Sequence, residues 1–196
     1  MQIIKEKEAV VKRIERDFIT LFKYLWYKDF PAVESDELPK RANWTIHMGL
    51  VVRQCAGLLG ARALFESGGR TDAVVQYSEQ DILTYVEWEW KRAHTDINEI
   101  EKLRSKAGQA VFQTFIGYSR VEDVAEALKQ ALDIWTDADS PLIYFLITYD
   151  LVKGNRHFKE LVTYQFTKNR YKKIRSQPAL PWVVNRKKFI NADENT

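Results

Sequence analysis

The spacing of hydrophobic and polar residues predicts alternating helices and strands along most of the chain. Apolar residues recur at helical spacing in segments 2–28, 43–59, 96–106 and 122–135. Shorter apolar runs bounded by turn-forming residues predict strands at 63–66, 70–77, 82–91, 110–118, 142–149 and 160–167. The run at 142–149 is almost wholly apolar, which is typical of a strand covered on both faces. The pattern therefore predicts an α/β protein.

The order of these elements also predicts how the strands pair. The first three strands are joined by short turns and should form an antiparallel meander. The strands at 110–118 and 142–149 each follow a helix, which predicts parallel crossovers. The expected core is helix, three-strand antiparallel meander, helix, strand, helix, strand. We expect a single domain over 1–196, with an N-terminal helix at 2–28, this core at 43–150 and a C-terminal extension at 151–196.

The strand at 82–91 changes character along its length. Because side chains alternate between the faces of a strand, one face is predicted to hold Leu83, Tyr85, Glu87, Glu89 and Lys91. The other face is predicted to hold Ile82, Thr84, Val86, Trp88 and Trp90. The first face turns polar only where the strand leaves the core. A strand that was merely half-exposed would be polar along one whole face, so this end indicates a functional site.

A third carboxylate belongs to the preceding strand. Asp72 lies near the start of that strand, and an antiparallel hairpin places it beside Glu87 and Glu89. Three neighbouring carboxylates repel each other unless a positive charge lies between them. Mg²⁺ prefers oxygen ligands and needs only one or two carboxylates besides water and phosphate. The alternative is a solvated acidic strand end without a ligand.

These residues resemble the restriction-endonuclease-like nucleases, the PD-(D/E)xK superfamily. The resemblance rests on Gly-Arg-Thr-Asp72, a strand, a turn, and an apolar strand that ends in Glu87-Trp-Glu89. The predicted element order over about 43–150 is also the core order of that fold. The resemblance implies that Asp72 is the first acid, Glu87 the second, and Glu89 a variant of the usual lysine. In a second register, Glu89 is the second acid and Lys91 the lysine. Neither register has the proline that often precedes the aspartate.

The resemblance implies a divalent-metal-dependent nuclease that hydrolyses phosphodiester bonds, with DNA as the expected substrate. Asp72, Glu87 and the Trp88 carbonyl would hold Mg²⁺ or Mn²⁺. Glu89 would bind a second metal or orient the attacking water, and Lys91 would support the charge on the leaving group. Because a fold does not determine function, two alternatives stay open on the same fold. One is a non-catalytic nucleic-acid-binding protein, and the other is a structural assembly protein.

Charge is unevenly distributed along the chain. The net charge is +3, yet residues 153–188 contain eleven Lys or Arg and one acidic residue, Glu160. Interleaved aromatic residues (Tyr171, Trp182 and Phe189) are available to stack on bases. A solvated basic face is the alternative. The expected nucleic-acid-binding residues are Lys168, Arg170, Lys172, Lys173, Arg175, Arg186, Lys187 and Lys188.

Composition narrows the remaining possibilities. A chain of 196 residues with 45% hydrophobic content is long enough for one well-formed core. It contains no apolar run long enough to cross a bilayer, and its first residues are charged where a signal peptide would be apolar. We therefore expect a cytoplasmic protein without a membrane partner, and a homodimer stays open. The single cysteine, Cys55, excludes an internal disulfide, and His47 is expected at a helix surface.

Overall fold

One mixed sheet runs through the computed structural model, which describes residues 2–32, 41–67, 71–92 and 97–184. Its seven strands follow one another across the sheet in chain order: β1 (Arg62–Ser67), β2 (Thr71–Ser78), β3 (Asp81–Arg92), β4 (Phe112–Arg120), β5 (Leu142–Val152), β6 (Asn155–Thr167) and β7 (Arg170–Pro178). Strands β1 to β3 pair antiparallel, β3 to β5 pair parallel, and β5 to β7 pair antiparallel. The predicted α/β class, the meander and the parallel crossovers are confirmed.

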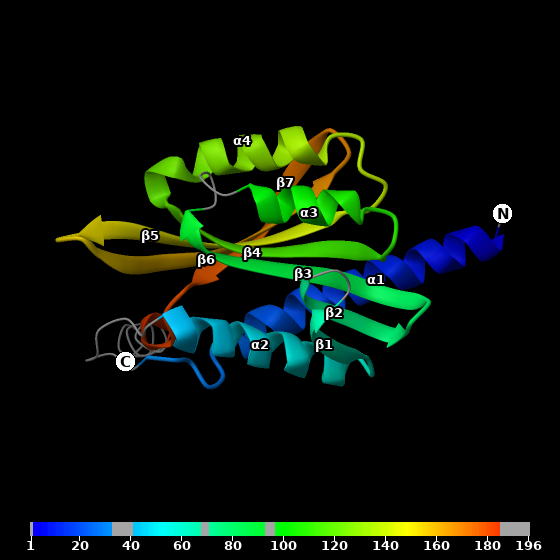
Figure 1. Cartoon of the computed structure of the whole chain (residues 1–196), viewed down its shortest axis with the longest axis horizontal. Coiled ribbons are helices and arrows are strands. Elements are labelled where there is room, and N and C mark those ends of the chain that lie inside the picture. The colour runs from blue at the N-terminus through cyan, green and yellow to red at the C-terminus, as the bar shows by residue number, and fades with distance from the viewer. Residues whose placement is uncertain (1, 33–40, 68–70, 93–96, 185–196) are drawn as a thin grey trace, which may run out of the picture.

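Helices cover both faces of the sheet (Figure 1). One face carries α1 (Gln2–Leu25) and α2 (Arg41–Leu58), and the other carries α3 (Asn98–Ser105), the short η1 (Val121–Asp123) and α4 (Val124–Trp135). Each face buries its own hydrophobic cluster beneath these helices. Within the described residues, no helix is both long and apolar enough to span a membrane.

The C-terminal extension differs most from its prediction. The sequence predicts only the strand at 160–167 there, whereas the structure adds β7 at the edge of the sheet. The ring of Tyr171 packs against Phe166, with centroids 5.2 Å apart, while the charged side chains of β7 stay exposed. An edge strand tolerates such charges because one of its sides faces water. Residues 186–188 lie outside the described residues.

A β-bulge shifts the predicted alternation of β3. Val75 pairs with Thr84, but the next residue, Gln76, pairs with Ile82, so Leu83 is an extra residue in β3. As a result Leu83 packs in the cluster under α1 and α2, and Ile82 packs against the cluster under α3 and α4. The predicted faces are therefore wrong for these two residues. From Tyr85 onward the alternation follows the prediction.

The N-terminal helix and the C-terminal extension are predicted as separate additions, but they contact each other. Trp26 Nε1 donates a hydrogen bond to the Ala179 carbonyl at 2.8 Å, and Gln177 Nε2 donates one to the Lys23 carbonyl at 2.8 Å. The Phe22 ring stacks on Phe145 of β5 with centroids 3.9 Å apart. Helix α1 is thus an integral cover of one sheet face.

His47 lies inside the protein, so its predicted place at the surface is wrong. Its side chain is 2% exposed and packs among the rings of Trp26, Phe30 and Trp44. Burial lowers the pKa of this imidazole to about 4. His47 is therefore a neutral core residue at physiological pH.

Replacing Phe22 with alanine should show how much α1 contributes to stability. Phe22 is fully buried against Phe145, so Phe22→Ala should lower the free energy of unfolding by about 3–5 kcal/mol. Tyr24 on the same helix is 81% exposed, and Tyr24→Ala should change it by no more than about 0.5 kcal/mol. Urea denaturation of the two variants measures both effects. Equal effects would mean that α1 does not cover the sheet as described.

Candidate active site

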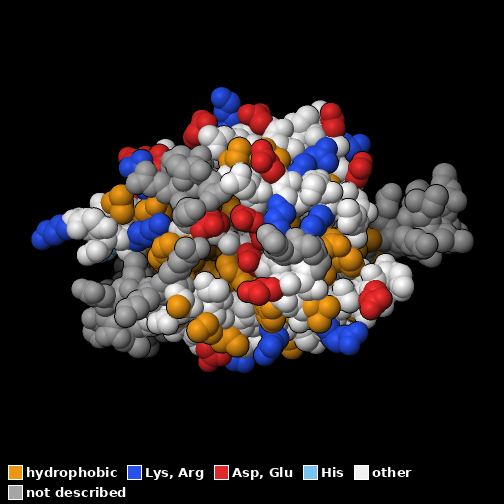
Figure 2. Space-filling view, viewed as in Figure 1, with side chains coloured by type: hydrophobic (Ala, Val, Ile, Leu, Met, Phe, Trp, Pro, Cys, Tyr) orange, Lys and Arg blue, Asp and Glu red, His pale blue; other side chains and the backbone are white. Residues whose placement is uncertain are grey.

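A cavity of about 330 Å³ lies at the end of β3 beside α3. One part of its lining is charged and consists of Asp72, Glu87, Glu89, Glu99 and Lys102. Another part is aromatic and includes Trp44, Trp90 and Tyr118. Figure 2 shows acidic side chains gathered near the middle of the visible face of the protein, next to basic side chains that lie below α3. We call this space the acid cavity.

Asp72 and Glu87 meet across the β2–β3 pair. Ala73 pairs with Val86, so Asp72 and Glu87 occupy neighbouring positions on the two strands. The Trp88 backbone N–H donates a hydrogen bond to Asp72 Oδ2 at 2.8 Å. The Glu87 side chain is only 1% exposed. The hairpin thus brings together the two acids that the first register pairs.

A lysine from α3 completes this group. Lys102 Nζ lies 2.6 Å from Glu87 Oε1 and 3.4 Å from Glu99 Oε2. Glu99, Lys102 and Lys106 recur at helical spacing and form a polar stripe beside the buried Ile100 and Leu103. This stripe is the sequence signal that α3 presents a lysine toward a polar site. The sequence alone does not indicate which acid the stripe meets.

Burial dominates the titration of both acids. It raises the pKa of Glu87 to about 8; the nearby charges of Asp72 and Glu99 also raise it, and the hydrogen bond with Lys102 lowers it. Burial likewise raises the pKa of Asp72, and its hydrogen bond from Trp88 lowers it. Glu87 Oε2 is buried without a hydrogen-bond donor among the described residues. The pair therefore retains a proton near neutral pH.

Glu89 and Lys91 stand apart from this pair. Glu89 lines the acid cavity and is partly exposed, and the side chain of Lys91 lies outside the described part of the chain. The described residues contain no group of three or more His, Cys, Asp or Glu side chains placed to hold a metal ion. Asp72 and Glu87 nevertheless fit a hard cation, because Mg²⁺ needs only one or two carboxylates and no described residue donates a hydrogen bond to Glu87 Oε2.

The aromatic part of the cavity is a feature that the sequence analysis does not find. Trp90 stacks on Trp44, with ring centroids 5.9 Å apart. The guanidinium of Arg156, from the β5–β6 hairpin, lies 4.4 Å from the centroid of the Trp90 ring. Arg156 Nη1 also donates a hydrogen bond to the Trp90 carbonyl at 2.9 Å. Because these residues are far apart in sequence, no local pattern indicates their contact.

The predicted nucleic-acid-binding residues do not reach the acid cavity where the structure describes them. Three strands separate β3 from β7, which carries Arg170, Lys172, Lys173 and Arg175. Gln165, paired with Lys172, hydrogen-bonds to Glu15 of α1, on the face opposite α3. Lys168 lies in the turn before β7, and Arg186, Lys187 and Lys188 lie outside the described residues.

The interleaved aromatic residues are engaged within the protein where they are described. Trp182 packs edge-on against Phe30, with centroids 5.9 Å apart, and Tyr171 packs against Phe166. Phe189 lies outside the described residues. Base stacking on Trp182 or Tyr171 would therefore compete with these protein contacts.

Comparison of the sequence with protein-family models and with curated proteins finds no significant match.

The pH dependence of stability should reveal the proton held by Glu87. The pKa of Glu87 in the folded protein, about 8, exceeds its ordinary value of 4.5, so between these pH values the folded state binds a proton that the unfolded chain has lost. The free energy of unfolding should therefore fall as pH rises through this window. Glu87→Gln should remove this decline, which amounts to about 4 kcal/mol of unfolding free energy between pH 5 and 8.

Urea denaturation at several pH values between 5 and 9 measures this difference between wild type and Glu87→Gln. Glu101→Gln, at an exposed acid on the same helix as Lys102, is the matched control and should keep the wild-type profile. If Lys102 instead kept Glu87 ionised throughout this range, neither state would bind a proton at Glu87, and wild type and Glu87→Gln would show the same profile.

Proposed function

We propose that this protein is a divalent-metal-dependent nuclease that hydrolyses phosphodiester bonds, with DNA as the substrate, in the acid cavity. The observation that carries the proposal is the buried Glu87, which lies beside Asp72 and contacts Lys102 from another element. A buried carboxylate with a strongly raised pKa in a cavity is a feature of functional sites. The chain order α2, β1–β3, α3, β4, α4, β5 also agrees with a restriction-endonuclease-like core.

Asp72 and Glu87 would hold Mg²⁺ or Mn²⁺ through their carboxylate oxygens. The bound cation would offset the negative charge of the scissile phosphate and allow water to attack it near neutral pH. The Trp88 N–H fixes the orientation of Asp72 through its hydrogen bond to Oδ2. Glu87 must lose its proton to bind the cation, so binding should strengthen as pH rises toward 8.

Lys102 would take the position that a strand lysine has in the resembled family. The Lys102 ammonium lies within hydrogen-bonding distance of Glu87. It would bond to a phosphate oxygen instead when a cation binds the Glu87 carboxylate. Glu89, at the open part of the cavity, would orient the attacking water. The first register is favoured because Asp72 accepts its hydrogen bond from Trp88, directly after Glu87. In that register Glu89 stands where the lysine is usual, and Lys102 would supply the positive charge instead.

A second candidate function is nucleic-acid binding without catalysis. It is favoured by one observation: Lys102 Nζ lies 2.6 Å from Glu87 Oε1, so the protein itself supplies a positive charge at this carboxyl group. A buried Lys–Glu contact persists as a purely structural element when its geometry is good. Metal binding separates the two candidates.

Plasmid nicking tests the proposed reaction. Wild type should nick DNA in millimolar Mg²⁺ or Mn²⁺ and lose activity with a chelator. Asp72→Asn and Glu87→Gln should each reduce cleavage at least about 100-fold because either change removes a carboxylate that holds the cation. Glu101→Gln is the charge-matched control. Chelator-resistant cleavage would contradict a metal-dependent reaction, and no cleavage with any metal would leave only the second candidate.

Thermal unfolding tests metal binding without relying on activity. Mg²⁺ or Mn²⁺ binds the folded state and should raise the melting temperature by mass action. The rise should be larger at pH 8.5 than at pH 6, because Glu87 holds a proton at the lower pH. Asp72→Asn should abolish it. A rise that is unchanged in this variant would place the metal elsewhere.

Glu89→Lys distinguishes the two registers. In the first register Glu89 stands where a lysine is usual, so part of the cleavage and the metal-dependent rise in melting temperature should survive. In the second register Glu89 is an indispensable acid, and the same change should remove both. Glu122→Lys, at an exposed acid outside the cavity, provides the same charge change as a control.

A further inference from the structure

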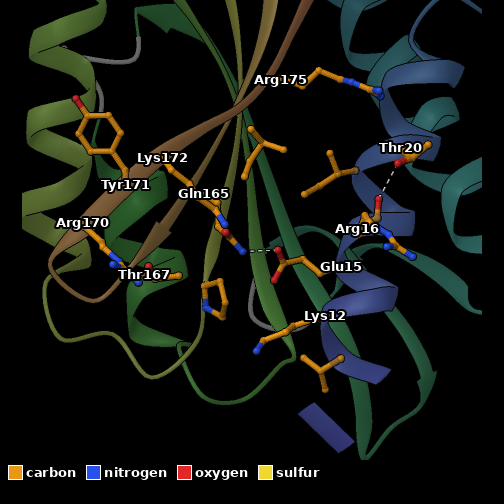
Figure 3. A pocket seen from close by; sticks show the side chains of 14 residues that line it. Lys12, Glu15, Arg16, Thr20, Gln165, Thr167, Arg170, Tyr171, Lys172 and Arg175 are labelled. Carbon is orange, nitrogen blue, oxygen red and sulfur yellow. Dashed lines mark hydrogen bonds between the residues drawn. The ribbon is translucent and has the colours of Figure 1, made fainter. Parts of the chain in front are cut away.

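A larger groove of about 1140 Å³ lies between α1 and β7, on the sheet face opposite α3 (Figure 3). Basic side chains line it from both elements: Lys12 and Arg16 from α1, and Arg170, Lys172 and Arg175 from β7. Among its described lining residues the one acid is Glu15. We call it the α1–β7 groove.

The register of β7 explains why its basic residues share this groove. Arg170, Lys172 and Arg175 pair with Thr167, Gln165 and Thr163, which alternate along β6 and therefore face the same side. A bulge at Ile174 supplies the extra residue that keeps Arg175 on this side. The sheet thus presents a row of cations to α1.

The floor of the groove is aliphatic. Val11 and Ile174 line it and remain 36% and 39% exposed. The Tyr171 ring points away from α1 and toward α4, where it packs on Phe166 (Figure 3). An occupant that covers this floor must offer apolar surface as well as negative charge.

Beside the groove, Lys23 is a buried amine without a hydrogen-bond partner among the described residues. Its side chain is 2% exposed. Burial, followed by the charges of Arg175 and Lys173, lowers its pKa to about 8. Neighbouring cations repel each other, and an anion at Arg175 would relieve this repulsion.

Glu15 cannot balance these cations, because it is one acid among five basic side chains of the groove lining. It is 8% exposed and is hydrogen-bonded to Gln165. Burial raises its pKa, while Lys172 and Lys12 act in the opposite direction. The groove therefore favours an anionic occupant.

We propose that the α1–β7 groove binds a single-stranded nucleic acid. Its phosphates would contact the basic side chains of both walls, and its unpaired bases would cover the aliphatic floor. A duplex keeps its base faces stacked inside and presents mainly sugar and phosphate, so it would leave the floor uncovered. The choice of nucleic acid over an acidic polypeptide rests on the proposed nuclease function.

Fluorescence anisotropy with a labelled DNA strand of about 16 nucleotides, the upper end of site sizes for single-strand-binding folds, tests this proposal. The protein is kept in chelator, so that cleavage does not interfere. The same strand in duplex form and a polyglutamate of equal charge serve as competing occupants. The single strand should bind most tightly, with an affinity that falls steeply as salt rises.

Matched double variants locate the binding. Lys172→Ala with Arg175→Ala should weaken single-strand binding about tenfold or more and flatten its salt dependence. Arg62→Ala with Lys129→Ala removes the same charge at exposed positions on β1 and α4 and should weaken binding less than about threefold. Lys12→Ala with Arg16→Ala should reproduce the effect from the α1 side. Circular dichroism confirms that each variant is folded.

Every other outcome overturns the proposal. Equal losses in the β7 and control variants would mean unspecific attraction to the whole surface. Tighter binding of the duplex or of polyglutamate would identify a different occupant. The experiments also separate this proposal from the nuclease proposal. If the protein never cleaves DNA but the groove variants alone lose strand binding, only the nuclease proposal is contradicted. If the protein cleaves DNA but the groove variants bind like wild type, only the groove proposal is contradicted.

Discussion

Parallel pairing of β3 with β4 is the constraint on which the acid cavity depends. Parallel neighbours cannot be joined by a tight turn, so the chain must cross over the sheet between them. Helix α3 is this crossover, and it buries Ile100 and Leu103 on the sheet. The same packing brings Lys102 to Glu87 at 2.6 Å. A hairpin after β3 would have left Glu87 without a helix above it.

The burial of Glu87 then determines its chemistry. Removing a carboxylate from water costs several kcal/mol even in real proteins, and the nearby Lys102 offsets only part of this cost, since the pKa of Glu87 stays raised to about 8. A buried Lys–Glu contact adds little net stability compared with apolar residues of the same volume. Stability is therefore a weak explanation for this contact. A buried carboxyl group that holds a proton near neutral pH is better suited to a site where a cation replaces that proton.

The sequence predicts the parts of the site that depend on local geometry. Asp72 and Glu87 lie on two strands joined by a short turn, so strand alternation and hairpin pairing suffice to bring them together. The bulge at Leu83 is local too, but no residue pattern indicates it. It exchanges the sheet faces of only the first residues of β3. The contact between Lys102 and Glu87 depends on how α3 is oriented on the sheet. The polar stripe of α3 indicates that orientation but not which acid Lys102 contacts.

Other features depend on contacts between distant segments, and the sequence does not show these. His47 is buried because Trp26 and Phe30, from the preceding helix and its turn, close around it. Strand β7 reads as a basic tail because its charges face solvent along an edge, and only its pairing with β6 reveals a strand. The contact between Arg156 and Trp90 also joins segments that are distant in sequence, so no local pattern indicates it.

The small net charge conceals a separation of charge between the two cavities. Four strand intervals of about 4.8 Å separate β3 from β7, which gives about 19 Å. At physiological ionic strength charges are screened over about 8 Å, so the cations of the α1–β7 groove do not neutralise the acid cavity. A phosphate that approaches Asp72 and Glu87 is repelled when they are ionised, and only a charge bound there removes that repulsion. The groove needs no such cofactor, so the proposed strand binding and the proposed cleavage are separable.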